Sequence, residues 1–178
     1  MSGLRHIALP TYDVTVGTGL LDRIGDVARD KAPAHRYAVI TDSNVGPAYA
    51  ARVQRALGNE RTSVFTIPAG ESHKTRESWA RVTDEMFAAR FGRDSAIIAL
   101  GGGVIGDLAG FVAATFMRGI PFVQVPTTLL AMIDASVGGK TGVDTAAGKN
   151  LVGAFHQPAA VVADLAVLAT LPLATWSK

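Results

Sequence analysis

No cysteine occurs anywhere in the 178-residue sequence. Disulfides and thiolate metal ligands are therefore excluded, and this fits a reducing compartment such as the cytoplasm. Long apolar runs are missing as well, because stretches such as 96–100 are far shorter than the roughly 20 residues that cross a bilayer. The N-terminal stretch MSGLRHIALPTYD lacks the apolar segment of a signal peptide. We therefore expect a cytoplasmic protein that does not bind a membrane.

Charge of either sign is scarce too. Charged residues make up 18% of the chain, the net charge is +2, and no basic stripe occurs, so nucleic-acid binding is not expected. The histidines, at positions 6, 35, 73 and 156, are widely separated and form no H-E-x-x-H pair. A G-x-S-x-G motif is also absent, which argues against a serine hydrolase.

The apolar pattern that is present predicts strands alternating with helices. At 48% hydrophobic content, the chain is long enough for one domain and short for two. Strands are expected at 12–16, 36–41, 63–67, 95–100, 121–125 and 160–163, with helices at 20–28, 44–57, 75–91, 104–117 and 127–133. The run 95–100 is apolar throughout, as in a strand buried on both faces of a parallel sheet. We predict a doubly wound, mostly parallel, Rossmann-like α/β domain over residues 1–178, with 174–178 as a connection to a further element.

A glycine-rich turn follows the most apolar strand. The stretch Gly101-Gly-Gly-Val-Ile-Gly106 satisfies G-x-G-x-x-G and opens an expected helix. Such glycines let backbone amides approach a pyrophosphate at a helix N-terminus, or else they serve close packing of helix on sheet. The acid expected about 20 residues later for the ribose is missing. Asp42, after a different strand, is the candidate replacement.

Polar side chains follow other strands as well. Ligands of such sheets bind outside the carboxyl ends of the strands, where Asp42, Asn44, Glu71, Lys74, Thr127 and Thr128 are expected to lie. Each has a purely structural alternative. Asp42, Asn44 and the two threonines are also typical helix caps. Glu71 and Lys74 are spaced as a solvated i, i+3 pair.

The segment 134–153 places Lys140 and Lys149 in glycine-rich chain. Two ammonium groups beside accessible backbone N–H groups suit an anion. A P-loop is excluded, because Asp134 and Val143 stand where its first glycine would be needed. The alternative is a hairpin or irregular loop whose lysines are solvated.

In combination these segments resemble the 3-dehydroquinate synthase family of sugar phosphate cyclases. The matching residues are Thr41-Asp-Ser-Asn44, Gly70-Glu-Ser-His-Lys74, Gly101 to Asp107, Met117-Arg-Gly119, Val125-Pro-Thr-Thr128, Asp134, Ser136 to Thr141, Gly148-Lys-Asn150 and Thr170-Leu-Pro172. The resemblance implies a homodimeric cytoplasmic lyase that uses NAD and a divalent metal, zinc or cobalt. Its reaction converts 3-deoxy-D-arabino-heptulosonate 7-phosphate to 3-dehydroquinate and phosphate, in the shikimate pathway of aromatic amino acid biosynthesis.

Matching positions imply two groups of site residues. NAD would be held by Asp42, Asn44, Glu71, Lys74, Gly102, Gly103, Val104, Asp107, Thr127 and Thr128. The sugar phosphate would meet Asp134, Lys140, Lys149 and Asn150, with Arg118 reaching the phosphate from the partner subunit.

Two departures from the family pattern matter. Asp144 stands where the family often has asparagine, which adds a negative charge near an anion site. Family members are also about twice as long, and their helical C-terminal half supplies the metal ligands, so this chain is expected to bind NAD without turnover. The alternatives are another sugar phosphate cyclase, of the 2-epi-5-epi-valiolone or 2-deoxy-scyllo-inosose synthase type, or a non-catalytic nucleotide-binding module.

Overall fold

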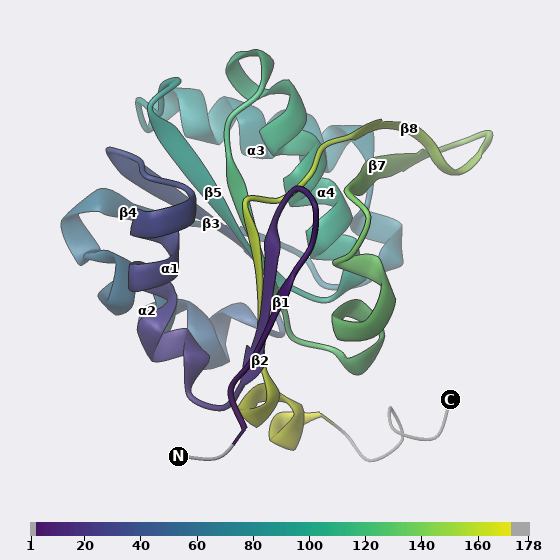
Figure 1. Cartoon of the computed structure of the whole chain (residues 1–178). Coiled ribbons are helices and arrows are strands. Elements are labelled where there is room, and N and C mark those ends of the chain that lie inside the picture. The colour runs from purple at the N-terminus through teal and green to yellow at the C-terminus, as the bar shows by residue number, and fades with distance from the viewer. Residues whose placement is uncertain (1–2, 172–178) are drawn as a thin grey trace.

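The computed structural model describes residues 3–171, so the expected connection at 174–178 and Pro172 of the family pattern lie outside the described residues. Its centre is a seven-stranded sheet in the order β1-β2-β9-β6-β5-β3-β4 (Figure 1). The strands are β1 (Arg5–Ala8), β2 (Asp13–Gly17), β3 (Arg36–Asp42), β4 (Thr62–Ile67), β5 (Ser95–Gly101), β6 (Phe122–Pro126) and β9 (Ala160–Asp164). Strand β1 pairs antiparallel with β2, and the other pairings are parallel.

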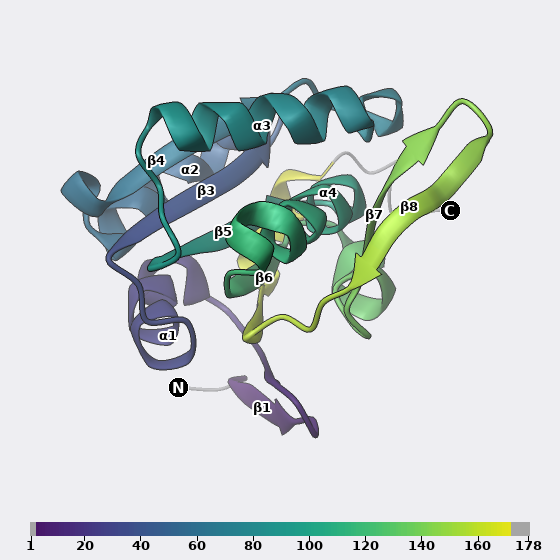
Figure 2. The ribbon, with the colours of Figure 1, turned by 90° about the horizontal axis from the view of Figure 1, so that it is seen from above.

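Helices cover both faces of this sheet. On one face lie α1 (Ile24–Lys31) and α2 (Gly46–Leu57), and on the other lie α3 (Arg76–Ala88) and α4 (Gly103–Thr115) (Figures 1 and 2). Short helical turns occupy the connections: η1 (Leu20–Arg23), η2 (Asn59–Arg61), η3 (Glu71–His73), η4 (Phe116–Arg118), η5 (Ala131–Ala135) and η6 (Leu165–Thr170). Thr75 caps α3 as its sequence position predicts, since its side chain accepts a hydrogen bond from the backbone N–H of Ser78.

The side chains of the central strands point alternately to the two faces of the sheet and form one apolar core on each face. Val39 and Ile98 pack in the cluster that includes α1 and α2, whereas Ile40 and Ile97 pack in the cluster that includes α3 and α4. Successive side chains of a strand point to opposite faces, so β3 and β5 each contribute to both clusters. Every residue of β5 is buried. The prediction of a doubly wound, mostly parallel α/β domain is confirmed.

The sheet contains a point where its winding reverses. After β3 the chain passes through α2 to β4, while after β5 it passes through α4 to β6 on the other side. Because β3 and β5 are neighbours, the segments that follow them diverge at the carboxyl edge of the sheet, and we call this part of the edge the crevice. Such a switch point is where open α/β sheets bind ligands.

Several elements differ from the expectation. Strand β1 was not predicted, because it is an exposed edge strand with no buried alternating face. The helix expected over 104–117 ends at Thr115, since Met117 and Arg118 have left-handed φ values of 51° and 69°. The helix expected over 127–133 is centred later, as the π-helical turn η5, in which the backbone N–H of Ser136 reaches the carbonyl oxygen of Ala131.

The glycine-rich lysine segment forms a projecting hairpin. Strands β7 (Lys140–Thr145) and β8 (Gly148–Phe155) pair antiparallel and extend from the body of the molecule beyond α4 (Figure 2). The base of β7 is anchored, because Val143 is buried in the cluster that includes α3 and α4. The segment is therefore a hairpin, whereas an anion-binding role of its lysines stays a prediction.

The close approach of α1 to α2 depends on Gly25. A Cβ atom there would overlap the backbone carbonyl oxygen of Ala56, so Gly25→Ala must push the two helices apart. We expect the free energy of unfolding in urea to fall by about 1–3 kcal/mol. The control is Gly46→Ala, where the nearest atom is a Thr41 methyl group at 3.1 Å and the expected change is only about 0.5 kcal/mol. Equal losses in the two variants would contradict this account of the α1–α2 contact.

Candidate functional site

The helix N-terminus at the crevice is prepared for an anion. Helix α4 begins immediately after β5, with Gly102 as an extended N-cap residue and no acidic side chain in its first turn. The first backbone N–H groups of a helix have no partner within it, and the helix dipole adds partial positive charge there. The amides of Gly103 and Val104 are therefore potential donors at the carboxyl edge of the sheet.

The glycines of this turn have separate roles. A Cβ at Gly106 would lie 2.8 Å from Oε1 of Gln124, and one at Gly101 would lie 2.6 Å from Ile105, so these two glycines allow close packing. At Gly102 and Gly103 the nearest atoms are side-chain methyl groups of Thr128 and Ala135 at 3.2 Å. The packing alternative thus explains the first and last glycine of the motif. It leaves Gly102 and Gly103 on the backbone that faces the crevice.

Thr127 and Thr128 differ in the partners of their hydroxyl groups. Thr128 caps the next turn, because its Oγ1 accepts a hydrogen bond from the backbone N–H of Ala131 at 3.2 Å. Thr127 is buried, its backbone N–H donates to the carbonyl oxygen of Gly101 at 2.9 Å, and its Oγ1 has no partner among residues 3–171. A buried hydroxyl without a partner is costly and needs an explanation. A bound ligand at this edge would provide one.

Asp42 closes β3 on the other side of the crevice. Its Oδ1 accepts hydrogen bonds from the backbone N–H groups of Asn44 at 2.8 Å and Val45 at 2.9 Å. This oxygen of Asp42 therefore stabilises the turn before α2, and the alternative that Asp42 is the N-cap residue of that helix is wrong. The corresponding expectation for Asn44 is wrong, because α2 starts later, at Gly46, and its N-cap residue is Val45, which makes no side-chain capping bond.

The most buried charge of the site is Lys74, which is 3% exposed. Its Nζ donates hydrogen bonds to Oδ2 of Asp107, in α4, and to Oδ1 of Asn150, in β8. The alternative of a solvated Glu71–Lys74 pair is wrong, since Glu71 instead pairs with Lys149 at 3.2 Å. Three segments distant in sequence thus meet at one ammonium group.

Burial raises the pKa of the Asp107 carboxyl above its ordinary value, and this effect outweighs the others. The hydrogen bond and charge of Lys74 lower the same pKa, the charge of Glu71 raises it, and that of Lys140 lowers it. Desolvation disfavours the charged form of a carboxyl group, whereas a nearby cation favours it. Asp107 therefore depends on Lys74 to hold its negative charge.

A hollow of about 510 Å³ lies between α4, η5 and the hairpin. Four predicted residues line it: Asp107, Asp134, Lys140 and Asn150. Its remaining lining was not predicted and consists of Ala135, Thr141, Leu151, Gly153, Ala154 and Phe155. Ala135 lies in η5 and the other five residues lie in β7 and β8, and because they include consecutive positions such as 153–155, no alternation in the sequence marks them. The volume suits a small organic ligand.

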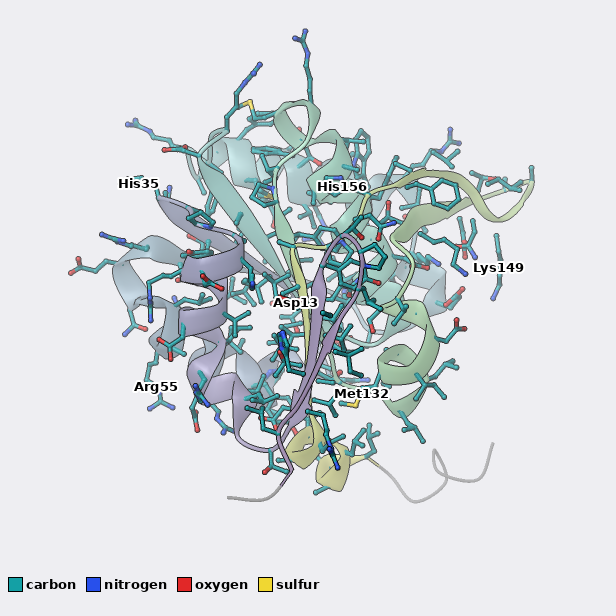
Figure 3. The ribbon with its side chains drawn as sticks, in the orientation of Figure 1. Asp13, His35, Arg55, Met132, Lys149 and His156 are labelled. Carbon is teal, nitrogen blue, oxygen red and sulfur yellow. The ribbon has the colours of Figure 1, made fainter. Side chains whose placement is uncertain are left out.

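Two of the residues predicted to meet the substrate, Lys149 and Arg118, lie away from this hollow. Lys149 is not among the lining residues, and 71% of its side chain is exposed. Figure 3 shows it on the projecting hairpin, on the opposite side of the molecule from Arg55 of α2. Arg118 lies beyond the C-terminus of α4, whereas Asp107 lies near its N-terminus. Contact of Arg118 with substrate from a partner subunit stays a prediction.

Neither a metal site nor a membrane-spanning helix occurs among residues 3–171. No group of three or more histidine, aspartate or glutamate side chains in this range is placed to hold a metal ion. No helix in the same range is long and apolar enough to cross a membrane.

Comparison with known proteins agrees with the geometry. The sequence profile of the family "3-dehydroquinate synthase N-terminal" matches residues 64–178. The chain belongs to the 3-dehydroquinate synthase family. It is 54% identical over 164 residues to the 3-dehydroquinate synthase of Caulobacter vibrioides, covering 90% of this chain and 44% of that protein. The chain thus spans somewhat less than half the length of the curated relatives it matches.

Solved structures of two other synthases share the fold. A 2-deoxy-scyllo-inosose synthase complexed with carbaglucose-6-phosphate, NAD+ and Co2+ matches with a TM-score of 0.85 and 29% identity, over 96% of this chain and 48% of that one. The 2-epi-5-epi-valiolone synthase of Streptomyces hygroscopicus, with NAD+ and Zn2+ bound, has a TM-score of 0.76 and 35% identity, over 96% of this chain and 47% of that one.

The buried charge pair makes a stability prediction. Asp107→Ala leaves the Lys74 ammonium buried without its carboxylate, and we expect the free energy of unfolding to fall by about 3 kcal/mol. The matched control is Lys149→Ala, which removes the exposed pair with Glu71 and should cost less than about 1 kcal/mol. Chemical denaturation at neutral pH measures both values. Similar small losses in the two variants would contradict a buried pair at Lys74.

The pKa of Asp107 gives a second prediction. In Lys74→Met the carboxyl loses the cation that lowers its pKa, so its titration, followed by carbon NMR, should move to still higher pH. Because this pKa is raised in the folded state, the folded chain binds the proton more tightly than the unfolded chain. The stabilisation that comes from protonated Asp107 is therefore present at low pH and is lost as the pH rises through the folded-state pKa. In Lys74→Met this pKa is higher still, so the loss extends to higher pH. An unchanged titration would contradict the contact.

Proposed function

We propose that this chain is the NAD-binding and substrate-positioning part of a 3-dehydroquinate synthase, a cytoplasmic carbon-oxygen lyase. Its reaction converts 3-deoxy-D-arabino-heptulosonate 7-phosphate to 3-dehydroquinate and phosphate, within the shikimate pathway. The observation that carries the proposal is the meeting of Lys74, Asp107 and Asn150 beside the hollow. The higher identity to 3-dehydroquinate synthases than to the two other cyclases supports this substrate over theirs.

The residues at the switch point fit NAD. Thr127 offers a buried hydroxyl without a partner, and the start of α4 offers free amides opposite Asp42. We assign the cofactor to Asp42, Asn44, Glu71, Lys74, Gly102, Gly103, Val104, Asp107, Thr127 and Thr128. When bound there, NAD supplies a reversible hydride acceptor. The chain's own part is to bind and orient it, with amides and the helix dipole facing the pyrophosphate.

The hollow beside this crevice fits a small sugar phosphate. Such a substrate carries a carboxylate and a phosphate, and Lys140 places a cation at the lining. Lys149 lies away from the hollow with 71% of its side chain exposed, and we assign it to the substrate as a second cation. A positioned cation stabilises the charge that develops on a departing phosphate. Asp134 and Asn150 supply polar groups that orient the sugar hydroxyls.

No group of described residues fits a divalent metal, so none of these roles passes through one. We place the zinc or cobalt ion of the complete enzyme outside residues 3–171. We likewise propose a homodimer in which the partner subunit contributes Arg118 to the phosphate. NAD binding without turnover by this chain stays a prediction, which an assay for 3-dehydroquinate with added substrate, NAD and zinc decides.

The unpartnered hydroxyl of Thr127 gives the test of the cofactor site. Thr127→Val keeps the shape of the side chain, so the free chain should be slightly more stable, by about 1 kcal/mol. NAD affinity measured by calorimetry should fall about fivefold, because the hydroxyl no longer meets the ligand. Lys140→Ala is the control and should retain wild-type NAD affinity. Wild-type affinity in Thr127→Val, or an equal loss in Lys140→Ala, would contradict the assignment.

A further inference from the structure

We propose that Asp144 is the positioning residue that holds Lys74 and Asn150 at the site, through a closed ring of three hydrogen bonds. The functional meaning of this inference rests on the proposed function, because that function gives Lys74 to the cofactor and Asn150 to the substrate. The ring itself rests only on the geometry of this chain.

Asp144 occupies an irregularity in the hairpin. Val143 pairs with Val152 and Thr145 pairs with Gly148, so the register shifts between them and Asp144 lies in the bulge. Its backbone forms a parallel bridge with Thr75, the residue that caps α3. Bulges commonly redirect a side chain or backbone group beside a functional site.

The three bonds run in one direction around the ring. The backbone N–H of Asp144 donates to the carbonyl oxygen of Lys74 at 2.7 Å. Nζ of Lys74 donates to Oδ1 of Asn150. The backbone N–H of Asn150 donates to Oδ1 of Asp144 at 2.8 Å, which closes the ring. Lys74 also donates to Asp107, so the ring is tied to α4.

Within the ring, the Asp144 side chain holds the backbone conformation of Asn150. Asn150 has a left-handed φ of 56°, a region that asparagine tolerates better than most residues but that still needs support. The bond to Asp144 fixes the backbone N–H of Asn150 in this conformation, and the Asn150 amide oxygen is then presented to the buried ammonium. Without the Asp144 acceptor, both the backbone and the amide oxygen of Asn150 lose their support.

The ring needs a hydrogen-bond acceptor at position 144 and not its negative charge. The Oδ1 atom of an asparagine accepts the same hydrogen bond from the backbone N–H of Asn150. The exchange therefore keeps the ring and changes only the local charge. An alanine at position 144 keeps the backbone bond to Lys74 but removes the acceptor.

The experiment compares Asp144→Asn with Asp144→Ala, which lose the same charge but differ in the acceptor. The readout is the titration of the Asp107 carboxyl by carbon NMR in the NAD-free chain, because Lys74 lowers its pKa while Glu71 raises it and Lys140 lowers it. We expect Asp107 to titrate at higher pH in Asp144→Ala than in Asp144→Asn, since Lys74 is then held less well. The backbone amide of Asn150 should exchange with solvent about tenfold faster in Asp144→Ala only.

Controls separate positioning from general loosening of the hairpin. Thr145→Val removes the neighbouring side-chain bonds to Ala147 and Gly148 but leaves the ring, and it should leave the Asp107 titration unchanged. If Asp144→Ala does not fold, Asp144→Gln moves the acceptor by one methylene group and should show the same shift. Identical Asp107 titrations in the asparagine, alanine and glutamine variants would overturn the proposal. Because no NAD is present, this result is independent of whether the chain binds the cofactor.

Discussion

The site depends on one constraint, which is that the buried ammonium of Lys74 must be paired. A charged group removed from water is tolerated only with a counter-charge and hydrogen-bond acceptors at short range. Those acceptors come from Asp107, in the first turns of α4, and from Asn150, in the hairpin. Satisfying one lysine therefore fixes the start of α3, the start of α4 and the projecting hairpin relative to one another. The hollow lies among the elements that this lysine joins.

The carboxyl edge of the sheet forms the other part of the site. Because β3 and β5 are neighbours whose connections leave in opposite directions, the winding of the sheet reverses at their carboxyl ends, which is the crevice. Partial positive charge at the start of α4 and the acid at the end of β3 give this crevice two chemically different sides. A dinucleotide has matching parts, with an anionic pyrophosphate and ribose hydroxyls. The hairpin then places Lys140 where a second, smaller anion would lie.

Local patterns predicted most of the scaffold. The uninterrupted apolar run of β5 and the glycines after it are properties of a few adjacent residues, and both were found where expected. Strand β1 escaped prediction because an exposed edge strand buries no face and so carries no alternation. The π-helical turn η5 escaped prediction because its widening depends on backbone bonds that skip one residue more than in an α-helix, such as the bond from Ser136 to Ala131, and no residue pattern marks them.

The sequence predicted which polar residues lie at the site, but not which of them pair with one another. Sequence order suggested Glu71 with Lys74, three residues apart, whereas the structure pairs Glu71 with Lys149 and Lys74 with Asp107. These partners are long-range, and the burial of Lys74 that selects them follows from tertiary packing. The ring through Asp144 is hidden from sequence for the same reason, since two of its three bonds join the hairpin to the segment before α3.

We propose above all that NAD binds at the crevice between β3 and β5. The most direct measurement is an NAD titration of the nitrogen-15-labelled chain, followed through its backbone amide resonances. The account predicts saturable shifts that are largest at the start of α4, from Gly102 to Ile105, and at Thr127. Shifts confined to another surface, such as the hollow lined by Leu4, Arg23 and Val27, or no shifts in the folded chain at millimolar NAD, would contradict it.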